Sequence, residues 1–170
     1  MSQLDSYIAI EGPIGVGKTS LAEMIAEKLN ARKVFEDFKG NPFLEEFYED
    51  PDSNALQTQV WFLLQRYQQQ QKEIKQLNAF QKGVITDYMF EKDRLFAEFT
   101  LRSQAEFELY SSVADILEKD IIKPDMVVYL QADTSRLMKN IKQRGRDFEK
   151  GVTTEYINCL LYTSPSPRDY

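Results

Sequence analysis

The stretch that decides the fold is Glu11–Ser20, which reads EGPIGVGKTS. It contains the pattern G-x-x-x-x-G-K-[ST], which in proteins forms a loop around phosphate groups. Glycines let successive backbone N–H groups turn toward the phosphates, and the amino end of the following helix adds a favourable dipole. We therefore expect Gly12, Gly15 and Gly17 to shape a phosphate-binding loop.

The residues around the loop supply the context that this pattern requires. A short apolar run, Tyr7–Glu11, precedes it. The segment Lys18–Asn30 follows with apolar residues at helical spacing, Leu21, Met24, Ile25 and Leu29, which predicts strand, loop and helix in that order. Lys18 can reach the outer phosphates, and the hydroxyl of Thr19 can ligate magnesium. Loops of this kind serve motors, switches and kinases alike, so other segments must identify the phosphate acceptor.

Composition limits the chemistry. The 170-residue chain is 42% hydrophobic and 28% charged, as expected of a single soluble domain. The absence of histidine and the single cysteine, Cys159, exclude histidine-based triads, cysteine nucleophiles and the usual zinc sites. A net charge of -6 argues against a general affinity for nucleic acid. The sequence shows neither a leader nor an apolar run of the roughly 20 residues that span a bilayer, so we expect a cytoplasmic protein without a membrane partner.

Further short apolar runs alternate with helical stretches along the chain. The predicted strands are Lys33–Glu36, Val84–Asp87 and Met126–Leu130. The helical stretches include Ser103–Ile122 and a glutamine-rich segment over about Ala55–Phe80, whose glutamines we expect mostly on a solvated face. This alternation predicts an α/β fold with a parallel sheet covered by helices on both faces.

Two acids fall at the ends of predicted strands. The carboxyl ends of parallel strands line one crevice together with the phosphate loop, so Glu36 could face an acceptor hydroxyl. Asp87 could hold magnesium or its water shell. The alternative for each acid is an ordinary solvated surface residue.

Two polar patterns on helices complete the candidate site. The basic run Arg136–Arg146 is a candidate lid over the phosphates, because the planar fork of arginine holds several oxygens; the alternative is a solvated basic face. Gln59 and Arg66 lie two helical turns apart on one face. The carboxamide of Gln59 matches the edge of a nucleobase, unless it belongs to the solvated glutamine face.

The end of the chain departs from this pattern. The segment Cys159–Asp169, CLLYTSPSPRD, corresponds to the translation of a transposase adapter used in sequencing libraries. Its prolines do not continue the helix that starts at Thr154. A natural Ser/Pro tail is the alternative. We expect residues 1–158 to form one domain and residues 159–170 to be a non-native tail that replaces the natural carboxyl end.

The assembled pieces resemble the deoxynucleoside kinase family, which includes deoxycytidine, deoxyguanosine and bacterial deoxyadenosine kinases. The likeness covers residues 7 to about 158 and rests on the loop and on NPFLEEFYEDP, QTQVWFLLQRYQQQ, TDYMFEKDRLFA and YLQADTSRLMKNIKQRGRDFEKGVTTEY. It implies a P-loop kinase fold, lacking its last strand and helix here, and a homodimer. It also implies ATP-dependent phosphorylation of the 5′-hydroxyl of a deoxynucleoside in nucleotide salvage, with magnesium.

The resemblance also assigns roles to individual residues. It implies that Glu36 accepts the proton of the 5′-hydroxyl, that Tyr48 and Glu149 hold the sugar 3′-hydroxyl, and that Arg144 and Arg146 act from the lid. The implied ATP-binding residues are Gly12, Gly15, Gly17, Lys18, Thr19 and Ser20, with Thr19 and Asp87 near the metal. The residues matched to base recognition are Gln59, Arg66 and Asp93.

One departure from the family pattern concerns charge. Many members carry an acid-Arg-Ser triplet after the third strand, whereas Asp87 is followed here by Tyr88 and Met89. Lys92 and Arg94 are the candidates for the missing positive charge, and nothing in the sequence chooses between them. The sequence also leaves open whether the substrate base is a purine or a pyrimidine.

Two rival functions remain. A nucleoside monophosphate kinase of the thymidylate type would need further cationic groups to bind the phosphate of its acceptor. The residues matched to the sugar instead favour an acceptor without a charged phosphate. A non-catalytic nucleotide-binding subunit with the kinase fold would have no need of Lys18, Glu36 and Arg144 together.

The replaced carboxyl end generates the first testable prediction. The pattern stops near Asn158, before the fifth strand and closing helix usual in this fold class, which leaves the strand Met126–Leu130 at a sheet edge with uncovered apolar side chains. Each apolar side chain that is no longer buried costs roughly 1.5 to 3 kcal/mol. The sum over several side chains can exceed the total free energy of unfolding of a domain, about 5 to 15 kcal/mol. We predict that the 170-residue chain is poorly soluble or inactive beside a chain that keeps its genomic reading after Ile157. Equal unfolding curves and equal kinase activity in the two chains would contradict this.

Overall fold

The computed structural model describes residues 6–37, 40–75, 83–146, 149 and 151–163. Residues 164–170, most of the predicted non-native tail, lie outside the described residues, as do residues 76–80 of the predicted glutamine-rich helix. Within the described part, no helix is both long and apolar enough to cross a membrane.

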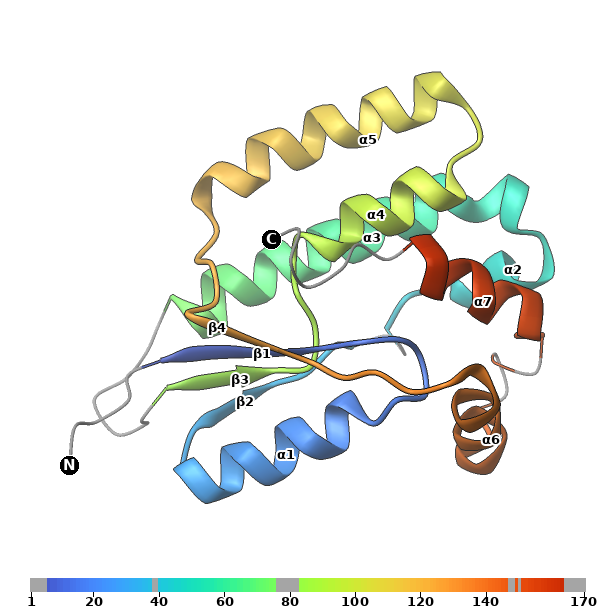
Figure 1. Ribbon diagram of the computed structural model, residues 1–170. Helices are drawn as coiled ribbons and strands as arrows, with labels where there is room; N and C mark the ends of the chain where they lie inside the picture. The colour runs from blue at the N-terminus through green and yellow to red at the C-terminus, as the bar shows by residue number, and fades with distance from the viewer. Residues whose placement is uncertain (1–5, 38–39, 76–82, 147–148, 150, 164–170) are drawn as a thin grey trace.

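The centre of the fold is a four-stranded sheet in the order β2-β3-β1-β4, with every neighbouring pair parallel (Figure 1). The strands are β1 (Tyr7–Glu11), β2 (Arg32–Val34), β3 (Val84–Thr86) and β4 (Met126–Tyr129). Ala9 of β1 lies opposite Thr86 of β3 and Val127 of β4. The predicted parallel α/β sheet is confirmed.

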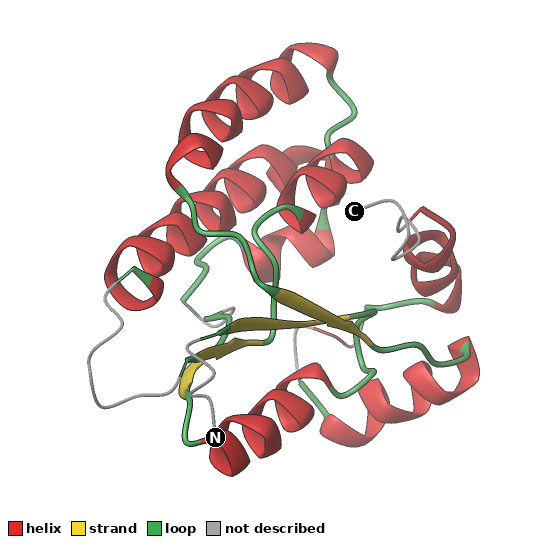
Figure 2. Ribbon diagram, turned by 60° about the vertical axis from the view of Figure 1, so that its left-hand side comes forward, coloured by secondary structure: helices red, strands yellow, loops and turns green. Residues whose placement is uncertain are grey.

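Helices cover both faces of the sheet because β1 sends alternate side chains to opposite sides. Ile8 and Ile10 pack with Ala22 and Ala26 of α1 (Lys18–Leu29) on one face. Tyr7 and Ala9 contribute to the core on the other face. Figures 1 and 2 show α1 below the sheet and α3, α4 and α5 above it.

The helices above the sheet form a second core of their own. They are α2 (Leu44–Glu49), α3 (Pro51–Gln69), α4 (Lys92–Thr100) and α5 (Gln104–Leu117), and their apolar faces meet around Phe90, Leu63 and Tyr110. A π-helical turn, η1 (Gln70–Ile74), continues α3, and a 3₁₀ turn, η2 (Glu118–Asp120), continues α5. The core thus extends well beyond the sheet.

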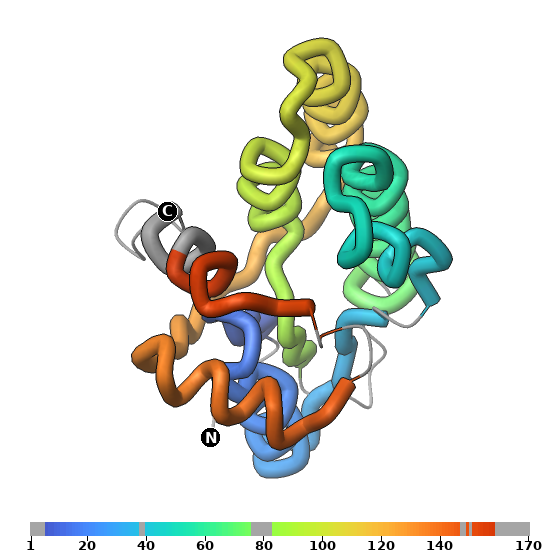
Figure 3. Tube along the Cα trace, turned by 90° about the vertical axis from the view of Figure 1, so that its right-hand side faces the viewer, coloured from blue at the N-terminus to red at the C-terminus, as the bar shows by residue number. Residues whose placement is uncertain are grey.

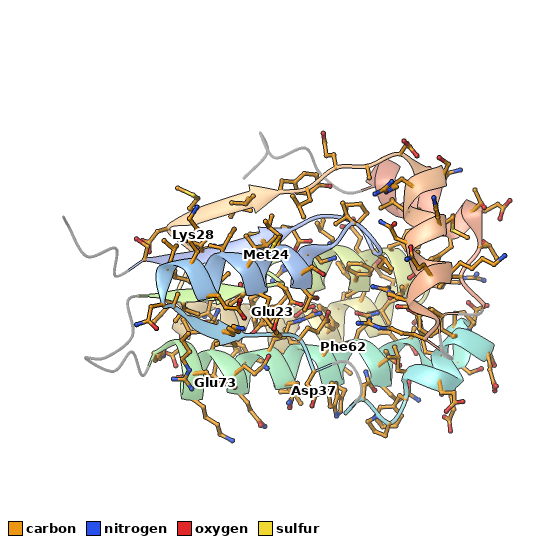
Figure 4. The ribbon with its side chains drawn as sticks, turned by 90° about the horizontal axis from the view of Figure 1, so that it is seen from below. Glu23, Met24, Lys28, Asp37, Phe62 and Glu73 are labelled. Carbon is orange, nitrogen blue, oxygen red and sulfur yellow. The ribbon has the colours of Figure 1, made fainter. Side chains whose placement is uncertain are left out.

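Several predicted boundaries and faces are wrong in detail. The α3 helix begins at Pro51, before the predicted start, because the Asp50 side chain accepts a hydrogen bond from Ser53 N at 3.4 Å and caps it. Most of the described glutamines are at least partly exposed, and Gln59 and Gln70 are the buried exceptions. Met24, expected among the apolar residues of α1, is 60% exposed and is labelled on the face of α1 nearest the viewer in Figure 4.

The strands β2 and β3 end earlier than predicted. Glu36 lies two residues beyond β2, and Asp87 follows β3 directly. The chain leaves the ladder there because the backbone N–H of Glu36 donates to the Asp87 carboxylate, at 2.9 Å, rather than to a neighbouring strand. Both acids therefore lie at the carboxyl ends of strands, but in the loops just past them.

The basic segment after β4 docks on the phosphate loop. It forms α6 (Thr134–Arg144), whose buried Leu137 and Ile141 pack against Ile14 and Val16 of the loop. In Figure 3 this orange helix runs close to the blue start of α1. The last helix, α7 (Thr154–Thr163), adds Ile157 to the same cluster.

Among the described residues, β4 has one neighbouring strand, β1, and lies at the edge of the sheet. Met126 and Val127 on it are 55% and 40% exposed. The predicted edge position of this strand, with uncovered apolar side chains, is confirmed.

The docking of α6 on the loop predicts that Gly15→Ala destabilises the protein more than Gly145→Ala. Both glycines have positive φ, +83 and +62, so an alanine is strained at either position. A Cβ at Gly15 would in addition meet Ile141 Cγ1 at 2.8 Å and the Leu137 carbonyl oxygen at 2.9 Å, whereas nothing lies within 4 Å at Gly145. We expect a further loss of about 1 to 3 kcal/mol in the free energy of unfolding for Gly15→Ala, measured by denaturant titration. Equal losses would contradict close packing of α6 on the loop.

Candidate active site

A cavity of about 700 Å³ opens at the carboxyl ends of the strands. The phosphate loop, α2, α3, α4 and α6 all contribute to its wall. The predicted site residues that line it are Gly15, Gly17, Lys18, Thr19, Ser20, Glu36, Tyr48, Gln59, Arg66, Asp87, Asp93, Arg144, Arg146 and Glu149. Gly12 does not line it, because it is packed behind the loop, where a Cβ would meet the Leu130 carbonyl oxygen at 2.5 Å.

The side chain of Lys18 folds back over the loop. Its Nζ donates to the carbonyl oxygens of Gly12 at 2.8 Å and Pro13 at 3.2 Å. Burial and, after it, the nearby positive charge of Lys92 lower the pKa of Lys18 to about 8, although the nearby acids oppose the shift. Lys18 is therefore still predominantly an ammonium at neutral pH, although it is less firmly protonated than an exposed lysine.

Asp87 connects the loop to the segment after β2. Its Oδ2 accepts a hydrogen bond from the Thr19 hydroxyl at 2.5 Å, and its Oδ1 accepts one from Glu36 N at 2.9 Å. Burial raises the pKa of Asp87, and the bonds from Thr19 and Glu36 oppose that rise. A hydroxyl and a single carboxylate side by side are suitable magnesium ligands, since magnesium is usually held by one or two protein oxygens together with water and phosphate. In the described ranges no three His, Cys, Asp or Glu side chains form a metal cluster.

Arg66 joins two acids within the cavity. Its guanidinium makes ion pairs with both Glu36 and Asp93, and it stacks on the Phe62 and Tyr88 rings, with Cζ 5.1 and 5.4 Å from their centroids. Burial pushes the pKa of Glu36 up, but the positive charges of Arg66 and Lys18 outweigh it and hold that pKa below its usual value. Glu36 is therefore an ionised carboxylate with a fixed orientation.

The predicted base-reading residues meet at this end of the cavity. Gln59 is buried on the same face of α3 as Arg66, one turn beyond Ala55. Two polar atoms of residues that line the same cavity, Arg66 Nε and Asp93 Oδ2, are buried without a hydrogen-bond partner among the described residues. A buried polar atom without a hydrogen-bond partner destabilises the protein unless a ligand supplies that partner. The two atoms are therefore suited to bind the polar edge of a ligand.

The two predicted lid arginines, Arg144 and Arg146, both contact Glu149, the acid predicted to bind the sugar. Arg144 Nε donates to Glu149 Oε2 at 2.7 Å, and its NH2 group makes a second contact with the same carboxylate. Arg146 pairs with Glu149 at 3.5 Å. Burial, with the nearby Tyr156 and Glu149, raises the pKa of Tyr48, so its hydroxyl stays protonated and able to donate.

Sequence reasoning missed two residues that shape the cavity. Glu11 is buried, and its Oε1 accepts from Gly12 N at 2.6 Å and pairs with Lys92. Asn140 Nδ2 donates to the Gly15 carbonyl at 2.7 Å and holds α6 to the loop. The sequence signal for Glu11 was an acid at the end of an apolar strand, and that for Asn140 was an amide inside a basic helix. Both patterns are common among surface residues, so neither pointed to the cavity.

Known proteins are similar to this chain over nearly its whole length. The family model for deoxynucleoside kinase matches residues 8–163. The chain belongs to the deoxynucleoside kinase family. A deoxyguanosine kinase of Bacillus subtilis is 37% identical over 155 residues, 91% of this chain and 74% of that protein. A deoxyadenosine kinase of Dictyostelium discoideum is 34% identical over 159 residues, 91% of this chain and 63% of that protein.

Solved structures agree with the sequence relatives. A deoxyadenosine kinase from M. mycoides with bound dATP has the same fold, with a TM-score of 0.81 at 26% identity, over 93% of this chain and 81% of that one. The predicted P-loop kinase fold and the predicted deoxynucleoside kinase activity with ATP are confirmed. The monophosphate kinase and the non-catalytic subunit are not favoured as alternatives.

The ion pair of the mostly buried Arg66 with the buried Asp93 predicts a large cost for Arg66→Met in this kinase. The substitution leaves Asp93, whose side chain is 3% exposed, without its ion-pair partner. Breaking a buried pair from one side destabilises a protein by about 3 to 5 kcal/mol. The matched control is Arg102→Met, because Arg102 pairs with Asp52 at the surface and such pairs contribute about 1 kcal/mol or less. Similar unfolding midpoints for the two variants would show that the Arg66 pairs do not stabilise the fold.

Proposed function

We propose that this deoxynucleoside kinase transfers the γ-phosphoryl group of ATP to the 5′-hydroxyl of a purine deoxynucleoside, with Glu36 as the general base. The observation that carries the proposal is the position of Glu36. Its ionised carboxylate lines the same cavity as Lys18 and Thr19 of the phosphate loop, and Arg66 fixes its orientation. An acceptor hydroxyl bound between loop and carboxylate would be placed for in-line attack.

The loop and its neighbours supply the phosphate end of the site. Backbone N–H groups of the loop and the Lys18 ammonium would bind the ATP phosphates. The hydroxyl of Thr19 and the carboxylate of Asp87, which contact each other, would hold magnesium. A bound magnesium ion would neutralise charge on the phosphate oxygens. Arg144 and Arg146 line the cavity from the α6 side, where they can stabilise charge on the transferring group.

The opposite end of the cavity suits the nucleoside. Tyr48 and Glu149 would bind the sugar 3′-hydroxyl, with the protonated phenol as donor and the carboxylate as acceptor. Gln59, with the unpartnered atoms of Arg66 and Asp93, would bind the edge of the base. The purine assignment is supported by relatives named for deoxyguanosine and deoxyadenosine.

The wider setting of the reaction remains a proposal. Nucleotide salvage is the role that fits a kinase acting on free deoxynucleosides, and we propose that it operates in the cytoplasm. A homodimer is supported by the exposed Leu109 and Ile116 on α5, which are 55% and 66% exposed.

If Glu36 is the base, Glu36→Gln should lower kcat by roughly 10²- to 10⁴-fold, because the amide cannot accept the proton. The dissociation constant for ATP should change little, since Glu36 faces the acceptor. Glu98→Gln is the matched control, as Glu98 is exposed on α4 and does not line the cavity. Turnover of the four deoxynucleosides and their monophosphates should be measured for each protein. Unchanged turnover of Glu36→Gln removes the residue from the mechanism, and faster turnover of pyrimidine nucleosides contradicts the purine assignment.

A further inference from the structure

The segment after β3 brings no cation to the cavity directly. Tyr88 and Met89, which follow Asp87, are buried in the core above the sheet. The ring of Tyr88 instead supports the guanidinium of Arg66. Any cation that this part of the chain adds to Lys18 at the phosphate loop therefore comes from the start of α4.

The structure separates the two basic residues at the start of α4. Arg94 turns away from the cavity and pairs with Asp115 and with Glu118, the latter at 3.2 Å, beside α5. Lys92 turns toward the cavity and lines it. Residues two apart on a helix point in very different directions, so the packing of α4 allows only one of them to reach the phosphate loop.

The Lys92 ammonium meets the phosphate loop beside that of Lys18. Lys92 Nζ donates to the Gly12 carbonyl oxygen at 3.0 Å, and Lys18 Nζ donates to the same oxygen at 2.8 Å. Lys92 also pairs with Glu11, which is buried and whose Oε2 has no partner among the described residues. Two ammonium groups on one oxygen repel each other, and an anion between them would relieve that repulsion.

The placement of Lys92 on its helix is itself unfavourable. It is the first residue of α4, where the positive end of the helix dipole disfavours a cation. Its side chain is 19% exposed, so it is accessible from the cavity, and the Phe96 ring lies 5.4 Å from Nζ. A lysine needed only to neutralise Glu11 would not have to line the nucleotide cavity.

We propose that Lys92 is a further catalytic residue of this kinase, whose ammonium binds the γ-phosphoryl group during transfer. The inference rests on the proposed function and deepens it. In the step, the bond from the γ-phosphorus to the bridging oxygen of ADP breaks while the bond to the 5′-oxygen forms, and the hydroxyl proton passes to Glu36. Lys92 stays protonated and forms no covalent bond. Its charge stabilises the phosphoryl oxygens together with that of Lys18, whose ammonium contacts the same Gly12 carbonyl oxygen.

The test compares Lys92→Met with Arg94→Met, a charge removal two residues away on the outer side of α4. In Lys92→Met we expect kcat to fall by about 10²- to 10³-fold. We also expect the ratio of the dissociation constants for ADP and ATP, measured with magnesium by calorimetry, to fall by about tenfold, since only ATP carries the γ-phosphate. Arg94→Met should keep both the ratio and kcat within about twofold of the unchanged protein.

A double variant separates this role from a structural one. Glu11→Gln with Lys92→Met removes both charges of the buried pair, so it should fold even if Lys92→Met alone leaves Glu11 uncompensated and fails to fold. If Lys92 acts on the phosphate, the double variant has the melting temperature of the unchanged protein, but its kcat stays low. Its ratio of the dissociation constants for ADP and ATP also stays lowered. Recovery of kcat to within about threefold would show that Lys92 only neutralises Glu11, and would overturn the proposal.

The same measurements distinguish this inference from the proposed function. If the unchanged protein does not phosphorylate deoxynucleosides, the proposed function fails, whereas the ADP to ATP ratio still reports on Lys92 by binding alone. If the unchanged protein is active and neither Lys92 variant alters kcat or the ratio, only the role of Lys92 is wrong.

Discussion

The carboxylate of Asp87 joins the ends of three parallel strands, and the geometry of the cavity depends on it. Asp87 follows β3, Thr19 follows β1 through the phosphate loop, and Glu36 follows β2. Among the described residues, no ladder hydrogen bonds hold these segments together beyond the ends of the strands. Asp87 holds them instead, because its carboxylate accepts hydrogen bonds from the Thr19 hydroxyl at 2.5 Å and from Glu36 N at 2.9 Å. The distance between the phosphate loop and the predicted base is therefore determined by one buried side chain.

Paired charges organise the rest of the cavity. Lys92 pairs with Glu11, Arg66 with Glu36 and Asp93, and Arg144 with Glu149. Low-dielectric surroundings make an uncompensated charge expensive, so each carboxylate holds its cation in place before any nucleotide binds. Phosphate groups could then take over part of each cation's pairing with little rearrangement of the protein, which is the preorganisation that phosphoryl transfer requires.

Much of the fold was predictable because its signals are local. The apolar runs that become β1, β3 and β4 are nearly continuous, as expected for strands buried in a parallel sheet, and the loop pattern links β1 to α1 over a few residues. The errors lie where long-range contacts override local preference. Met24 has helical spacing with its apolar neighbours but is exposed on α1. For Gln59 the sequence left open a nucleobase contact or a solvated face, and the packing of α3 buries its side chain.

The sequence by itself determined the phosphate loop, the parallel α/β order and the family, because each depends on residues close together in the chain or on several distinctive segments. Only the tertiary structure decided which charges meet. Glu11 and Lys92 come into contact because β1 and the start of α4 converge on the phosphate loop, although 81 positions separate the two residues in the sequence. Lys92 and Arg94 are equivalent as sequence features, and the rotation of α4 about its axis, imposed by the packing of its buried Asp93 and Ala97, directs one to the cavity and the other to α5.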